Sequence, residues 1–421
     1  MMQGYHKRIV DRYFEQRLKA AGALLIEGPK WCGKTTTAKN LSSSALYLQE
    51  PDDFDSNMYY AENRPSKLLE GEKPRLIDEW QVAPKIWNAV RFSVDKEKKR
   101  GLYILTGSSV PNLSESDRGL LHSGTGRIAR ARMRTMSLFE MGVSNGSISL
   151  RELFDGKTDF ETDSDMTLER LAEIICIGGW PSNLDLEIQD GIRTSMDYVE
   201  SIVNSDISRV DGIRRNPYVT RQILSSLSRN ICTLAELPVI LKDIGNGSSR
   251  KTVSGYINAL RKIFVVEDIP AWSPALLSKA RLSASVKRNL TDPSIATAVL
   301  NIGPEKLVSD KPVFGSFFES MCIRDLRVYS QVSEAEVFHY HDTSDLEVDA
   351  IIEMPDGRWG AIEIKLHSGI EEGAKNLLRL KKKTKLVSEI EPSFMAVIVG
   401  TGSYQKRDDG VLVIPIGCLR D

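Results

Sequence analysis

The sequence predicts an α/β protein in three parts: an N-terminal domain around a phosphate-binding loop, a helical and winged-helix middle, and a second α/β domain at the C-terminal end. Three observations support this prediction. A glycine-rich string follows a short apolar run near residue 28. Three helix-length segments precede strand-like residues between 216 and 275. After residue 313, one helical segment is followed by several apolar strand-like runs.

The glycine-rich string is Gly28-Pro-Lys-Trp-Cys-Gly33-Lys34-Thr35, which fits the P-loop pattern G-x-x-x-x-G-K-[ST]. It lies between a predicted buried strand at 23–26 and a predicted helix that begins at Thr35. In such a loop the backbone N–H groups surround the β-phosphate, the lysine reaches the β- and γ-phosphates, and the hydroxyl ligates Mg²⁺. We therefore expect nucleoside triphosphate contacts from Gly28, Pro29, Lys30, Gly33, Lys34, Thr35 and Thr36.

Two further apolar runs end in polar side chains that complete the predicted site. The run from Pro74 ends in Asp78 and Glu79, so we expect Asp78 to join Thr35 in the Mg²⁺ shell and Glu79 to polarise the attacking water. The run from Gly101 ends in hydroxyls, which at the carboxyl end of a parallel strand lie at the ligand crevice. Thr106 or Ser108 is expected to sense the γ-phosphate, and the alternative is a turn that ends the strand.

Four arginines follow a glycine-rich turn at residues 123–126. A guanidinium group can neutralise transition-state charge in the site of a neighbouring subunit. We select Arg127 as this arginine finger, against the alternative that it has no role at the phosphates.

Several of these motifs occur together in an order that resembles the prokaryotic AAA-type ATPases with a C-terminal domain of unknown function. The resemblance rests on the P-loop, the strings that contain Asp78, Thr106 and Arg127, and the strings Met136-Ser-Leu-Phe-Glu, Gly178-Gly-Trp-Pro, Asp292-Pro-Ser, Glu347-Val-Asp and Glu363-Ile-Lys. It implies an AAA-type P-loop core, ATP as the nucleotide, and a homo-oligomer, for which a hexameric ring is one arrangement. The biological role is unsettled for the whole family.

Composition and charge agree with a cytoplasmic multidomain enzyme. The chain has 421 residues and a net charge of −1, so any site for a polyanion must be a local patch. Its five cysteines are scattered without a C-x-x-C pair, which argues against a disulfide framework or a structural zinc. The N-terminal residues lack the apolar segment of a secretion signal, and no apolar run approaches the length of a membrane span.

The middle of the chain predicts helices and then a winged helix. We expect helices at 168–177 and 192–210, then three helices at 218–229, 233–242 and 248–263, with residues 264–272 as the wing. The third helix would present Arg250, Lys251 and Asn258 to solvent, a pattern suited to double-stranded DNA, with the cations on phosphates and the amide near bases. The alternative is a winged helix that only packs against other parts of the protein.

The C-terminal part resembles the metal-dependent nuclease core with the signature D…[DE]-x-K, a restriction-nuclease-like α/β fold. Asp349 precedes Glu363 and Lys365, and period-two alternation places the last two on one face of a strand. Asp349 and Glu363 would bind Mg²⁺, and Lys365 would activate water or steady the scissile phosphate. Glu319 of the preceding helix is a further candidate for this site. Val348 replaces the proline of the full signature, and the alternative is a domain that has the fold without DNA cleavage.

These predictions divide the chain into an AAA-type ATPase domain at 1–155, a helical region at 168–215, a winged helix at 216–275, a linker region at 276–312 and a nuclease-like domain at 313–421. The leading hypothesis is an oligomeric Mg²⁺-dependent ATPase that moves or remodels a DNA or protein partner. The alternatives are an ATP-gated DNA nuclease and a nucleotide-switched scaffold. No membrane partner is expected.

Overall fold

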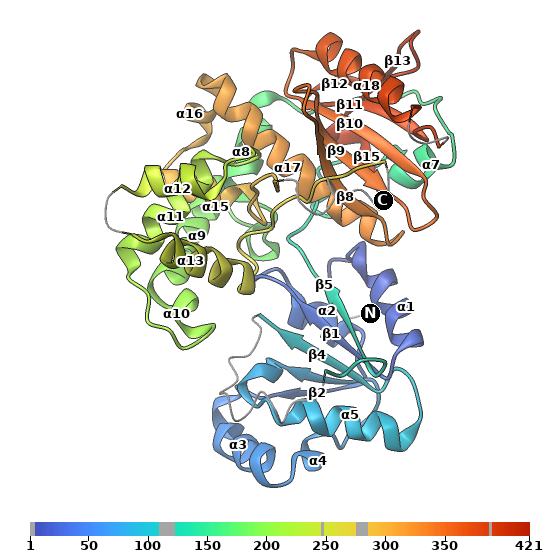
Figure 1. Cartoon of the computed structure of the whole chain (residues 1–421). Coiled ribbons are helices and arrows are strands. Elements are labelled where there is room, and N and C mark those ends of the chain that lie inside the picture. Colours follow the sequence, from blue (N-terminus) through green and yellow to red (C-terminus); the bar gives the residue numbers. More distant parts are fainter. Residues whose placement is uncertain (1–4, 109–122, 246–247, 275–284, 387–389) are drawn as a thin grey trace. The chain divides into compact units, whose positions relative to one another are not determined.

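The computed structural model describes residues 5–108, 123–245, 248–274, 285–386 and 390–421 (Figure 1). Its contacts divide the chain into two units. Unit 1 contains residues 1–134, 204–215 and 258–265, and unit 2 contains residues 135–203, 216–257 and 266–421. Both units are therefore assembled from segments that are distant in the sequence.

Unit 1 is a parallel sheet with helices on both faces (Figure 1). The strand order is β2 (Ser44–Tyr47), β3 (Arg75–Asp78), β4 (Tyr103–Gly107), β1 (Ala23–Glu27) and β5 (Ile128–Arg132). The helices are α1 (Val10–Ala20), α2 (Lys34–Asn40), α3 (Phe54–Asn63), α4 (Pro65–Leu68), α5 (Ile86–Glu97) and the single turn α10 (Ile207–Arg209). Short 3₁₀ turns at Pro51–Asp53 and Trp80–Val82 complete the element list.

Alternation along the strands of unit 1 produces its two core layers. Leu25 belongs to the layer that α3, α4 and α5 cover, whereas Leu24 and Ile26 belong to the layer of α1 and α2. Successive side chains of a strand point to opposite faces, so a continuously apolar strand such as Ala23–Ile26 is buried on both sides. All five strands run in the same direction, and their carboxyl ends therefore meet at one edge.

Unit 2 contains a helical group and a mixed sheet. The helices before the sheet are α7 (Leu150–Phe154), α8 (Leu168–Ile177), α9 (Ile188–Ser201), α11 (Pro217–Arg229), α12 (Leu237–Ile244), α13 (Arg250–Lys262), α15 (Pro293–Leu300) and α16 (Pro304–Ser309). A π-helical turn, Ile202–Asp206, follows α9, and a 3₁₀ turn lies at Pro181–Asn183. The end of α13, from residue 258, belongs to unit 1.

The sheet of unit 2 follows the long helix α17 (Lys311–Gln331), with strand order β13-β14-β11-β10-β9-β8. Its strands are β8 (Glu336–His341), β9 (Glu347–Glu353), β10 (Trp359–Lys365), β11 (Phe394–Val399), β13 (Gln405–Lys406) and β14 (Leu412–Pro415), and α18 (Ile370–Thr384) connects β10 to β11. Strands β8, β9 and β10 pair antiparallel, whereas β10, β11 and β14 pair parallel. Short pairs join β6 (Ile148–Ser149) to β15 (Leu419–Arg420) and β7 (Asp163–Ser164) to β12 (Gly402–Ser403), and a 3₁₀ turn lies at Ile416–Cys418.

Most predicted elements are present, with corrections at their ends. Helix α8 has the predicted bounds. Helix α12 begins at Leu237 rather than Thr233, because the Thr233 hydroxyl donates to the Asn230 carbonyl in a turn. Helix α13 is capped by Ser249, whose hydroxyl accepts from the Thr252 N–H.

The contact-based units differ from the predicted domain bounds at two places, and those bounds stay predictions. The first segment of unit 1 ends at Arg134, whereas the ATPase domain is predicted to end at 155, and residues 135–155 are grouped with unit 2. The predicted linker at 276–312 contains α15 and α16, and Asp292, Ser294 and Ile295 there are buried. Residues 276–284 of that prediction lie outside the described part of the chain.

A buried ion network explains several motifs of the sequence. Arg324 of α17 lies 3.2 Å from Asp292 Oδ2 and 2.8 Å from Asp325 Oδ1, and the side chains of all three are fully buried. Asp292 also accepts hydrogen bonds from Thr135, from the Gly179 N–H and from Ser294. The strings around residues 136, 178 and 292 therefore meet at the ion pair of Asp292 and Arg324. This pair connects the first residues of unit 2 with α8, α15 and α17.

Candidate nucleotide site

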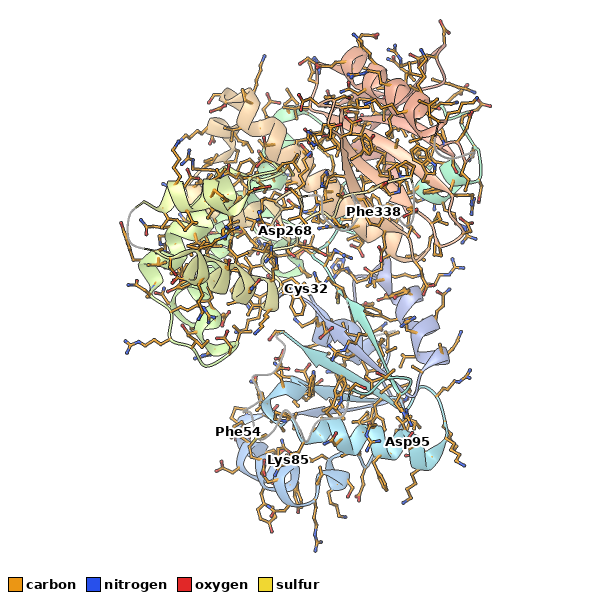
Figure 2. All side chains as sticks on the ribbon, viewed as in Figure 1. Cys32, Phe54, Lys85, Asp95, Asp268 and Phe338 are labelled. Carbon is orange, nitrogen blue, oxygen red and sulfur yellow. The ribbon has the colours of Figure 1, made fainter. Side chains whose placement is uncertain are left out.

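The P-loop lies where the sequence predicts it, at the carboxyl end of β1. Gly33 has a φ of 97°, a left-handed conformation that glycine adopts without strain, and it caps α2. A Cβ atom on Gly28 would lie 2.1 Å from the Met133 carbonyl oxygen, so only glycine fits there. Cys32 of the loop, labelled in Figure 2, is fully buried, and its thiol lies 3.7 Å from the same carbonyl.

Arg8 supports the loop from the N-terminal side. Its guanidinium donates to the carbonyls of Cys32 and Arg134, each at 2.9 Å. These bonds attach the P-loop to the residues that follow β5. The sequence reasoning did not identify Arg8, because nothing in its local pattern indicates carbonyl partners so far along the chain.

The predicted catalytic side chains converge at the carboxyl edge of the sheet. Thr35 Oγ1 donates to Asp78 Oδ1 at 2.8 Å, and Thr106 Oγ1 donates to the same oxygen at 2.6 Å. The Lys34 ammonium, almost fully buried, donates to the Pro29 carbonyl at 2.7 Å within the loop. The structure thus places α2, β3 and β4 around one carboxylate.

Glu79 adopts a left-handed conformation with a φ of 55°, which is uncommon for a residue with a side chain. The Thr106 hydroxyl accepts from its N–H at 3.1 Å, and Ser108 donates to its carboxylate at 3.1 Å. Gln81 also donates to this carboxylate, a contact that the sequence reasoning missed. Both hydroxyls proposed as γ-phosphate sensors therefore hold the Asp78 and Glu79 pair in place.

Lys30 and Thr36 lie at the exposed side of the loop. The Lys30 ammonium forms an ion pair of 2.6 Å with Asp206, a nearly buried residue of the π-helical turn. Asp206 lies 176 positions later in the sequence, so local pattern could not reveal it. The pair joins the P-loop to the middle segment of unit 1.

Arg127 does not join this group within its own chain. It precedes β5 and therefore lies at the amino-terminal edge of the parallel sheet, opposite the P-loop. Its Nε donates to Asp95 Oδ1 at 2.8 Å. Asp95 and Cys32 lie at different ends of unit 1 in Figure 2. Arg132, in contrast, pairs with Glu27 in register at the nucleotide edge.

This site defines a P-loop nucleotide-binding protein. The model of an AAA domain matches residues 20–142, and two models, each of a domain of unknown function, DUF8612 and DUF4143, match residues 168–306 and 314–419. The chain therefore carries an AAA-type P-loop ATPase domain followed by a C-terminal domain of unknown function.

Two of the solved structures that are similar to this chain have low sequence identity to it. A Walker-type ATPase of Pyrococcus abyssi is 14% identical, with a TM-score of 0.41, covering 69% of this chain and 94% of its own. The DNA clamp loader delta protein of Bacillus subtilis is 12% identical, with a TM-score of 0.21, covering 60% of this chain and 87% of its own. Both TM-scores are low, so neither similarity contributes to the inferences below. A comparison with curated proteins finds no match.

The winged-helix candidates lie on the exposed side of α13. Arg250, Lys251 and Asn258 are exposed, as predicted, and Asn258 accepts from Arg261 at 2.9 Å. Isolated antiparallel bridges join Val266 to Leu290 and Ile269 to Lys287 after this helix. The assignment of a winged helix stays a prediction.

The four predicted nuclease residues also lie together, but with ammonium groups among them. Lys365 lies 2.6 Å from Glu363 Oε2 and 3.5 Å from Asp349 Oδ2. Lys287, which the sequence reasoning missed, lies 2.5 Å from Glu319 Oε1 and 3.2 Å from Asp349 Oδ1. Within the described ranges, no group of three or more His, Cys, Asp or Glu side chains is placed to hold a metal ion. This differs from the Mg²⁺ site predicted at Asp349 and Glu363.

Burial and neighbouring charges shift the pKa values of these carboxyl groups in different directions. Burial, and then the charge of Asp349, raises the pKa values of Glu319 and Glu363 to about 8. Burial also opposes ionisation of Asp349, but the charges of Lys287 and Lys365 outweigh it and hold its pKa below the usual range. Asp349 is therefore the ionised member of the group near neutral pH.

Among the described helices, none is both long and apolar enough to cross a lipid bilayer.

Proposed function

We propose that this protein binds ATP with Mg²⁺ and hydrolyses it, as a homo-oligomer, to move or remodel a DNA or protein partner. The observation that carries the proposal is the convergence of Lys34, Thr35, Asp78 and Glu79 at one sheet edge, with Thr106 bonded to the last two. Three separate strings of the sequence supply these residues.

Each residue has a distinct role in this proposal. The Lys34 ammonium would bind the β- and γ-phosphates, and Glu79 would orient a water for attack on the γ-phosphate. Thr35 Oγ1 and Asp78 Oδ1, 2.8 Å apart, fit the coordination of Mg²⁺, a hard cation that prefers oxygen ligands. When bound, Mg²⁺ would neutralise charge on the phosphates.

Nucleotide binding should depend on Lys34 and not on lysine charge in general. We expect Lys34→Ala to weaken ATP binding by about 10- to 150-fold, because it removes charge-assisted hydrogen bonds worth about 1.5–3 kcal/mol. Calorimetric titration with MgATP measures this. The matched control is Lys39→Ala, an exposed lysine of the same helix, and equal affinities for the two variants would contradict the assignment.

The proposed oligomer requires an arginine that acts on a neighbouring subunit. Arg127 is half-exposed and lies at the sheet edge opposite its own P-loop, so a phosphate that it contacts would belong to another subunit. We expect Arg127→Ala to keep its ATP affinity and lose turnover. Mixing it with Glu79→Gln subunits should restore part of the activity, because each variant supplies the group that the other lacks. Specific activity that stays constant on dilution to monomers would contradict the shared site.

A DNA partner is favoured by the exposed basic start of α13. Arg250→Ala combined with Lys251→Ala should weaken binding to duplex DNA and reduce its salt dependence by about two phosphate contacts. Fluorescence anisotropy at two salt concentrations measures both effects. Lys96→Ala combined with Lys99→Ala, exposed lysines of unit 1, is the matched control. No binding by the parent protein at low salt would assign this region to packing.

Each of the two alternative functions requires a feature that the proposed ATPase does not. An ATP-gated nuclease requires metal at Asp349 and Glu363, where Lys365 already forms ion pairs. A nucleotide-switched scaffold requires binding at Lys34 with negligible turnover.

A further inference from the structure

Lys287 places a buried ammonium group among three carboxyl groups of the C-terminal domain, of which Asp349 is ionised. Its side chain is 1% exposed, and its Nζ lies 2.5 Å from Glu319, 2.8 Å from Glu347 and 3.2 Å from Asp349. Lysine is rarely buried this completely unless it is paired, because removal of the charge from water is costly. Three oxygen contacts compensate for that cost at this position.

The backbone around Lys287 is fixed on both sides. Lys287 and Ile269 exchange two backbone hydrogen bonds, of 2.8 and 2.9 Å. The Arg288 N–H donates to the Thr233 carbonyl at 2.7 Å, and its own carbonyl accepts from Cys232. These backbone hydrogen bonds hold the segment 285–291 in place, and the segment in turn positions the Lys287 ammonium.

The carboxylates come from two other elements. Glu319 belongs to α17, and Glu347 and Asp349 belong to β9. Asp349 Oδ2 accepts from the Ile364 N–H of β10 at 2.8 Å, which leaves Oδ1 for Lys287. Lys365 adds a second ammonium, bonded to Glu363.

These contacts conflict with a divalent metal ion in the same space. Mg²⁺ requires close to octahedral oxygen coordination at about 2.0–2.1 Å. The Lys287 ammonium, in contact with Asp349 and Glu319, occupies the region between them. Its positive charge also repels a second cation. The residues present therefore do not fit the Mg²⁺ that the nuclease resemblance implies.

We propose that the ammonium of Lys287 takes the position of a divalent cation in this carboxylate cluster, so that the C-terminal domain binds no Mg²⁺ or Mn²⁺ at Asp349. The cluster is then an internal ion network that joins segment 285–291 to α17 and β9. This inference does not depend on ATP hydrolysis, because the cluster lies in unit 2 and the P-loop lies in unit 1.

Mn²⁺ titration of the whole protein without nucleotide tests the proposal, with free Mn²⁺ followed by electron paramagnetic resonance. The four proteins are the parent, Asp349→Asn, Lys287→Met and the double variant. The parent and Asp349→Asn should bind the same number of ions. Lys287→Met should bind one more, and the double variant should lose that ion. Lys306→Met, an exposed lysine of the same unit, controls for the lost charge.

Thermal unfolding gives a second readout. Removal of Lys287 takes a counterion away from the buried, ionised Asp349, so Lys287→Met should unfold at lower temperature than the parent. Mn²⁺ should raise the unfolding temperature of Lys287→Met. Any change that Mn²⁺ causes in the unfolding temperature of the parent should be the same in Asp349→Asn.

Two results would overturn the proposal: an Asp349-dependent Mn²⁺ ion in the parent, or a folded Lys287→Met protein that gains no ion. If Lys287→Met does not fold, the comparison of the parent with Asp349→Asn still decides whether the cluster excludes metal.

Discussion

Glu79→Gln should bind ATP as the parent protein does and hydrolyse it about 10²–10⁴-fold more slowly, the usual contribution of a positioned acid–base group. The amide has nearly the shape of the carboxylate, and the Thr106 contact to the residue 79 N–H does not involve the side chain. What is lost is the basic oxygen that orients water. Single-turnover hydrolysis and a parallel binding titration measure the two effects separately.

Glu62→Gln is the matched control for Glu79, because Glu62 is an exposed carboxylate of the same unit, paired with Lys85 at the surface. It should leave both turnover and binding unchanged. Turnover by Glu79→Gln at the parent rate would remove Glu79 from the site. Loss of binding in that variant would show instead that Glu79 supports the shape of the loop.

Asp292→Ala should lower the free energy of unfolding of unit 2 by about 3–5 kcal/mol, because it breaks a buried ion pair from one side. Arg324 would lose the contact of 3.2 Å, and Thr135, Ser294 and the Gly179 N–H would lose their acceptor. Buried donors without a partner add to the cost. Urea denaturation followed by circular dichroism measures the change.

The matched control for this prediction is Asp356→Ala, which removes an exposed ion pair with Arg358 in the same unit. Exposed pairs contribute about 0–1 kcal/mol. A loss within that range in Asp292→Ala would mean that water replaces the missing carboxylate. The strings around residues 136, 178 and 292 would then need another explanation.

The P-loop residues were predictable because their chemistry is local. Eight consecutive residues specify both the turn and its ligand, and the strands on either side show their burial through apolar runs alone. The same holds for β10, where period-two alternation predicts a strand that carries Glu363 and Lys365 on one face. Asp78 and Thr106 were placed correctly because parallel strands align their carboxyl ends.

The partners of charged side chains were not predictable. Lys287 appears in the sequence as an ordinary basic residue beside Arg288, yet its ammonium is bonded to a carboxylate 62 positions away. The segment predicted as a linker region illustrates a related point: residues 285–309 contain α15 and α16, and many of their side chains are buried.

The sequence by itself therefore determined the nucleotide loop, the strands around it and the order of the elements, because backbone conformation and amphipathic pattern depend on near neighbours. Only the tertiary structure decided three pairings: Asp206 with Lys30, Arg324 with Asp292, where three separate motifs meet, and Lys287 with the carboxyl groups around Asp349. Electrostatic pairing acts through space, and residues far apart in the chain become neighbours only when the chain folds.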